Sequence, residues 1–130
     1  MILVDSSVWI DYFNGAITPQ TNRLDGFLDT ELIVIGDLIL TEVLQGFRHN
    51  KDFKQAQQLF ESLTFMEMLG KDIAIKSAKN YRTLRNKGVT IRKTIDLIIG
   101  TICIEAGLSL LHCDRDFDSL EKYLKLKVFR

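Results

Sequence analysis

The chain has 130 residues, 46% of them hydrophobic, and its 17 basic and 17 acidic side chains cancel. This length fits one domain, residues 1–130, with a real core, and the apolar fraction excludes a disordered chain. No apolar run approaches membrane-spanning length, and residues 1–5 lack the basic stretch of a signal peptide. We therefore expect a cytoplasmic protein without a membrane segment.

The neutral average hides an uneven distribution of charge. Residues 1–70 carry 4 basic and 10 acidic side chains, whereas residues 71–93 carry 8 basic side chains and one acidic side chain. We call residues 71–93 the basic block. Such asymmetry indicates a surface that attracts anions more clearly than the net charge does.

Apolar runs alternate with helical periodicity along the whole chain. The predicted strands are residues 2–4, 32–35, 64–69, 108–113 and 126–129. The predicted helices are residues 6–13, 19–29, 37–46, 50–63, 71–87, 94–106 and 116–123. This alternation predicts an α/β fold, a three-layer sandwich in which helices flank a central parallel sheet of about five strands.

Short polar residues and glycines mark the ends of the predicted helices. Thr18 before Pro19 is typical of a helix start, and Gly88 is a suitable residue just beyond a helix end. The predicted N-caps are Ser6 or Ser7, Thr18, Asp37 and Thr94.

Four acidic residues lie beside strongly apolar segments. Asp5 and Asp114 follow predicted strands, and we expect Glu42 and Asp96 in the first turns of helices. Each of them alone has an ordinary explanation as a turn former or capping residue. However, the carboxyl ends of parallel strands form one crevice, so the topology can bring all four together.

Acids next to a core are costly unless they are paired or bound to a cation. An all-oxygen cluster suits Mg²⁺ or Mn²⁺. A metal bound there polarises a phosphodiester, lowers the pKa of a water and stabilises the leaving oxygen. The four acids therefore predict a metal-dependent enzyme that acts on phosphate.

Four segments in this order resemble the PIN domain, and within it the VapC-type toxins. They are Val4-Asp5-Ser6-Ser7-Val8-Trp9-Ile10, Leu40-Thr41-Glu42-Val43-Leu44-Gln45-Gly46, Ile95-Asp96-Leu97-Ile98-Ile99-Gly100 and Leu111-His112-Cys113-Asp114-Arg115-Asp116-Phe117. The resemblance covers nearly the whole chain. It implies a single PIN domain with a five-stranded parallel sheet and endoribonuclease activity, in which water activated by the metal cleaves the RNA backbone. It also implies a VapB-type antitoxin partner and a homodimer.

The resemblance assigns roles to individual residues. It implies catalytic roles for Asp5, Glu42, Asp96 and Asp114. The metal ligands that it implies are Asp5, Asp96, Asp114 and Asp116. Ser6, Ser7 and His112 are predicted as supporting residues; an imidazole stands at residue 112, where the family often has a hydroxyl, and it either supports the metal site or orients a phosphate.

Three cations of the basic block recur at helical spacing. Lys79, Arg82 and Arg85 share one face of the predicted helix 71–87. Next to a nuclease site, such a stripe predicts contacts with RNA phosphates that carry no sequence information. The alternative is an ordinary solvated helix face.

Three other functions compete with this prediction. A Toprim-like phosphotransfer enzyme would use Asp114, Asp116 and Glu42, but it leaves Asp5 and Asp96 without a role. An inactive PIN-like RNA-binding module predicts missing acids, and none is missing. A haloacid-dehalogenase-type phosphatase needs a second aspartate two residues after Asp5, where Ser7 stands.

Overall fold

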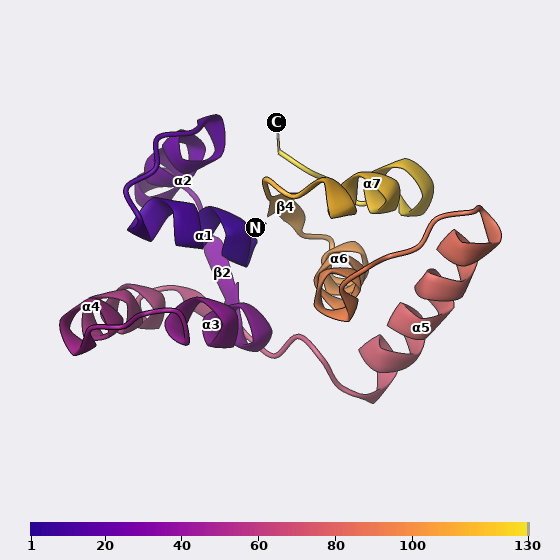
Figure 1. The fold of residues 1–130 in the computed structure, drawn as a ribbon, viewed down its shortest axis with the longest axis horizontal. Helices are drawn as coiled ribbons and strands as arrows, with labels where there is room; N and C mark the ends of the chain where they lie inside the picture. Colours follow the sequence, from indigo (N-terminus) through magenta and orange to yellow (C-terminus); the bar gives the residue numbers. More distant parts are fainter. Residues whose placement is uncertain (130) are drawn as a thin grey trace.

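The computed structural model describes residues 1–129, and a parallel four-stranded sheet in the order β3–β2–β1–β4 forms its centre (Figure 1). The strands are β1 (Ile2–Val4), β2 (Ile33–Gly36), β3 (Thr64–Met66) and β4 (Ser109–Leu111). In register, Ile2 pairs with Ile33 of β2, and Val4 pairs with Leu111 of β4. β1 is therefore central, and it is buried along its whole length.

Helices cover both faces of the sheet. They are α1 (Ser6–Phe13), α2 (Pro19–Thr30), α3 (Asp37–Leu44), α4 (Asn50–Glu61), α5 (Lys71–Asn86), α6 (Thr94–Ala106), the 3₁₀ helix η1 (Arg115–Phe117) and α7 (Asp118–Leu124). Figure 1 shows α1 to α4 gathered on one side of the strands and α5 to α7 on the other. Right-handed crossovers require this division, because the chain runs outward from β1 to β3 and then returns to β4. The predicted three-layer sandwich is confirmed.

The C-terminal segment extends the sheet by only one bridge. Val128 pairs with Leu110 in a parallel bridge, and Phe129 donates its backbone N–H to the carbonyl of Leu110 at 3.0 Å. The predicted strand 126–129 is thus reduced to this bridge. Lys125, in a left-handed conformation (φ 64°), is the C-cap of α7, and the segment that follows it meets a strand, β4, of only three residues. No helix in residues 1–129 combines the length and apolarity needed to span a membrane.

Helices α1 to α6 begin at the predicted residues, but the N-caps of α1, α3 and α6 lie before the predicted capping residues. Asp5, rather than Ser6 or Ser7, is the N-cap of α1, because its backbone is extended and its carboxylate accepts from the Ser7 N–H at 3.1 Å. The N-caps of α3 and α6 are Gly36 and Lys93 rather than Asp37 and Thr94. The Thr18 cap before Pro19 is confirmed, with the Thr18 hydroxyl accepting from the Thr21 N–H.

Asp37 fastens the loop that follows β3. One of its carboxylate oxygens accepts from the Met68 N–H at 3.0 Å and from the Leu38 N–H at 2.9 Å. The buried Met68 side chain then lies directly against Gly36, where an added Cβ would overlap the sulfur and Cγ of Met68. A glycine at the end of β2 is therefore required for the loop to close over the sheet.

The variant Gly36→Ala should lower the free energy of unfolding by about 1–3 kcal/mol, because a buried methionine has to move. Urea denaturation measures this change. Gly26→Ala is the control: Gly26 lies within α2 with no atom near an added Cβ. That variant should be about 0.5–1 kcal/mol more stable than the parent. Equal stabilisation by both substitutions would contradict the close packing at Gly36.

Candidate active site

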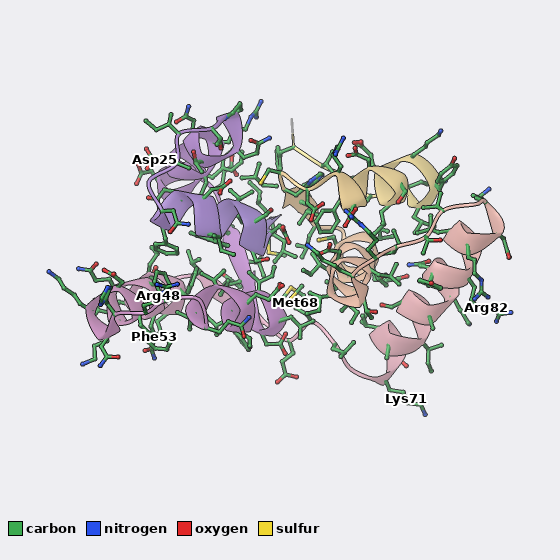
Figure 2. All side chains as sticks on the ribbon, viewed as in Figure 1. Asp25, Arg48, Phe53, Met68, Lys71 and Arg82 are labelled. Atoms are coloured by element: carbon green, nitrogen blue, oxygen red, sulfur yellow. The ribbon has the colours of Figure 1, made fainter. Side chains whose placement is uncertain are left out.

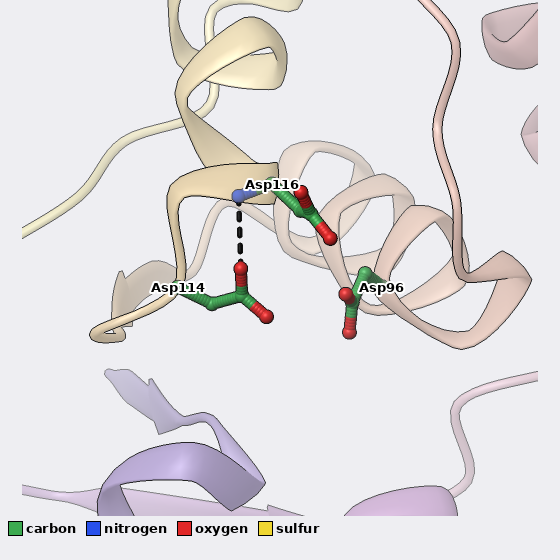
Figure 3. A group of neighbouring side chains, drawn as sticks. All are labelled: Asp96, Asp114 and Asp116. Atoms are coloured by element: carbon green, nitrogen blue, oxygen red, sulfur yellow. Dashed lines mark hydrogen bonds between the residues drawn. The ribbon is translucent and has the colours of Figure 1, made fainter.

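Three carboxylates meet where the C-terminal end of β4 approaches α6. Oxygens of Asp96, Asp114 and Asp116 all lie within 4.8 Å of one another (Figure 3). Asp96 is in the first turn of α6, while Asp114 caps η1 and accepts from the Asp116 N–H at 2.9 Å. We call these three residues the acid cluster.

Asp5 lies beside the acid cluster but outside it. Its N–H donates to the Leu111 carbonyl at 2.9 Å, which ties the end of β1 to the end of β4. One carboxylate oxygen accepts from the N–H and the hydroxyl of Ser7. The side chain is only 2% exposed, and burial raises its pKa although the Ser7 hydrogen bonds oppose this.

Glu42 approaches the site from α3. The expectation that it lies in the first helical turn is wrong, because α3 begins at Asp37 and places Glu42 in the next turn. The Ser6 hydroxyl donates to its carboxylate at 3.2 Å. Partial burial raises the pKa of Glu42, the Ser6 hydrogen bond lowers it, and the charge of Asp5 raises it further.

The pKa of Asp96 lies well above its ordinary value. Burial raises it to about 7, and the charges of Asp5 and Asp114 add to the effect. The pKa therefore lies close to neutrality, so the proton on Asp96 is readily lost when a cation arrives.

Two buried oxygens at the site have no hydrogen-bond partner among the described residues: Oδ1 of Asp5 and Oδ2 of Asp96. Buried polar atoms nearly always have a hydrogen-bond partner. Two buried carboxylate oxygens without one, at a site rich in acids, indicate that another group binds them. The surrounding atoms that could bind a metal are carboxylate oxygens, the ligands that hard divalent cations prefer. The residues present therefore fit a divalent metal ion.

His112 contacts the backbone of an acid rather than a carboxylate. Its Nδ1 accepts from the Asp114 N–H at 3.2 Å, and its ring packs on Phe117 with centroids 4.9 Å apart. Burial lowers the pKa of His112, against the charge of Asp5. The imidazole thus holds the turn from which Asp114 projects.

The predicted stripe Lys79, Arg82 and Arg85 is exposed on α5, where Figure 2 shows Arg82. None of the three has an ion pair with a site acid among the pairs of the described residues. The cations that do reach the acids are Arg92 and Lys93, which helical periodicity missed because they lie in a loop. Their membership of the basic block was the available signal.

The chain is similar in sequence and in fold to known bacterial proteins. Ribonuclease VapC11 of Mycobacterium tuberculosis is 28% identical over 133 residues, covering 98% of this chain and 97% of the relative. The structure of VapBC2 from Rickettsia felis, bound to a promoter DNA fragment, matches with a TM-score of 0.75 at 17% identity and covers 99% and 98% of the two chains. Mycobacterium tuberculosis VapC20, a sarcin-ricin loop cleaving toxin, matches with a TM-score of 0.69 at 13% identity, covering 92% and 94%.

The family comparison covers nearly the whole molecule. The model of the PIN domain matches residues 2–123, a range that contains all five acids described above and every strand of the sheet. The chain therefore belongs to the PIN domain family.

Proposed function

We propose that this chain is a VapC-type toxin, a metal-dependent endoribonuclease that cleaves the RNA backbone and is neutralised by a cognate antitoxin. The observation that supports the proposal most strongly is the acid cluster together with two buried oxygens, Oδ1 of Asp5 and Oδ2 of Asp96, that have no hydrogen-bond partner among the described residues. Relatives of matching length named as ribonucleases support it. The metal in this proposal is Mg²⁺ or Mn²⁺, because the available donors are carboxylate oxygens.

Each site residue then has a distinct task. Asp96, Asp114 and Asp116 would hold the cation, with Asp5 completing the site. The cation, when bound, supplies Lewis acidity at the phosphodiester. Glu42 has a raised pKa and faces the same site, so it is suited to accept a proton from the attacking water. Ser6 orients Glu42, Ser7 holds Asp5, and His112 fixes the turn at Asp114.

The proposed partners are RNA and a VapB-type antitoxin. Several structural neighbours are toxin–antitoxin complexes, including VapBC-5 from Mycobacterium tuberculosis, which matches with a TM-score of 0.65 at 19% identity. The homodimer and the cytoplasmic location stay predictions. The stripe of Lys79, Arg82 and Arg85 also stays a prediction, as a contact for RNA phosphates.

The family match weakens the Toprim-like alternative. The inactive RNA-binding module remains the relevant rival, since it shares the fold and differs only in chemistry. Cleavage of RNA by the purified protein, with Mg²⁺ or Mn²⁺ and then with chelator, separates the two.

Replacing single acids should remove cleavage while leaving the fold intact. We expect Asp5→Asn, Glu42→Gln, Asp96→Asn and Asp114→Asn each to lower the cleavage rate by roughly a hundredfold or more, with a smaller loss in Asp116→Asn. End-labelled RNA measures the rates, and circular dichroism checks the fold. Asp29→Asn, on the exposed side of α2, is the control and should cleave normally. Normal activity in Asp5→Asn or Asp96→Asn would exclude the assignment.

Stability without metal should fall as the pH rises from about 4 to about 7. The pKa of Asp96 is higher in the folded protein (about 7) than its ordinary value of 3.8, so the folded state binds the extra proton in this window. Added magnesium requires the ionised form, so the rise in melting temperature that it causes should grow over the same window. Differential scanning fluorimetry measures both trends. Asp96→Asn should reduce both, and unchanged trends in that variant would contradict the role of Asp96.

Expression of the chain alone should arrest bacterial growth, and co-expression of the cognate antitoxin should restore it. The comparison strain carries Asp96→Asn, which should grow normally because the protein no longer cleaves RNA. Growth curves after induction, with immunoblots to equalise protein levels, measure the effect. Normal growth with equal amounts of active parent would favour a housekeeping nuclease.

A further inference from the structure

Two adjacent cations reach the acid cluster from the segment between α5 and α6. Arg92 Nη2 lies 3.2 Å from Oδ1 and 3.5 Å from Oδ2 of Asp116, and Lys93 Nζ lies 3.7 Å from Oδ2 of Asp114. The neighbouring Ile91 is buried, which anchors the segment beside the site. The buried Ile91 thus anchors the backbone from which both cationic side chains reach the acids.

These ion pairs are exposed on the cationic side. The side chains of Arg92 and Lys93 are 79% and 65% exposed, whereas those of Asp116 and Asp114 are 16% and 23% exposed. Exposed ion pairs contribute little to stability and exchange easily. The pairs are therefore poor candidates for structural clamps, and each cation is available to another anion.

The negative charge of the site repels an anionic substrate. Five carboxylates face the region: Asp5, Glu42, Asp96, Asp114 and Asp116. A divalent cation compensates only part of this charge, so a backbone phosphate of RNA is still repelled. Arg92 and Lys93 are the basic side chains that contact these acids among the described ion pairs. A guanidinium also offers the planar fork that matches a phosphate.

We propose that Arg92 and Lys93 are the substrate-positioning pair of this site: they neutralise Asp116 and Asp114 before the metal binds, and they contact the RNA phosphate afterwards. This inference rests on the proposed function. It predicts effects of opposite sign on two ligands, because the pair competes with the metal for the acids but cooperates with it in holding RNA. A clamp that only stabilises the fold would affect both ligands in the same direction.

The test uses Glu42→Gln as the parent, which keeps the acid cluster and blocks cleavage. In that background, Arg92→Gln/Lys93→Gln is compared with the control Arg23→Gln/Lys54→Gln, which removes the same charge from exposed positions on α2 and α4. Isothermal titration calorimetry measures magnesium binding without RNA. Fluorescence anisotropy measures binding of labelled single-stranded RNA in magnesium at several salt concentrations.

We expect the site variant to bind magnesium about two- to fivefold more tightly, because competing cations are gone. Its RNA affinity should fall roughly tenfold or more, and the salt slope should shrink by about 0.7 for each lost phosphate contact. The control should change neither affinity. Any other combination overturns the inference, including unchanged RNA binding, or weaker binding of both ligands.

If the double variant does not fold, the single variant Arg92→Gln replaces it in the same measurements. The Arg92 side chain is largely exposed, so this substitution should leave the fold intact. Lys93→Arg keeps the charge and should keep the RNA affinity of the parent; a loss there would also count against the inference. A parent that binds neither magnesium nor RNA would refute the proposed function itself. A parent that binds both, with a site variant that matches it, would refute only the role of this pair.

Discussion

Burial of carboxylates at the carboxyl edge of the sheet is the constraint on which the site depends. Asp5 and Asp96 are only 2% and 6% exposed, and each keeps one oxygen without a hydrogen-bond partner among the described residues. Desolvation penalises their charged forms, and this is the largest cause of their raised pKa values. The remaining oxygens of the site are partly compensated by neighbours such as Ser6 and Ser7.

The strand order brings these acids together from distant parts of the chain. β1 lies between β2 and β4, so Asp5 at the end of β1 sits next to the segment after β4 that carries Asp114. The bond from the Asp5 N–H to the Leu111 carbonyl fixes this proximity. α6 begins at the same edge and supplies Asp96 from its first turn. The pairing of β1 with β4 in a parallel sheet therefore places Asp5 beside the acid cluster.

The sequence predicted the order of elements and the convergence of the acids, because apolar runs and strand-end acids follow from burial and topology. It did not predict details that depend on local backbone angles. Asp5 is the N-cap of α1 because its own backbone is extended. The sequence favoured Ser6 or Ser7 instead, because serine is an equally common N-cap residue. Glu42 lies in the second turn of α3, and this already follows from the predicted helix start, because α3 does begin at Asp37. Pairing of residues 126–129 was limited by the short edge strand β4.

In the basic block, helical periodicity identified the cations on a helix face but not the cations in the following loop. Helical spacing selected Lys79, Arg82 and Arg85, because it recognises only residues that share a helix face. Arg92 and Lys93 have no such spacing. Only the structure shows that they form ion pairs with Asp116 and Asp114. The block therefore divides into a solvent-facing stripe and a pair within reach of the acids. Because the Coulomb energy falls with distance, Arg92 and Lys93 offset the negative charge of the acids more strongly than the stripe on α5 does.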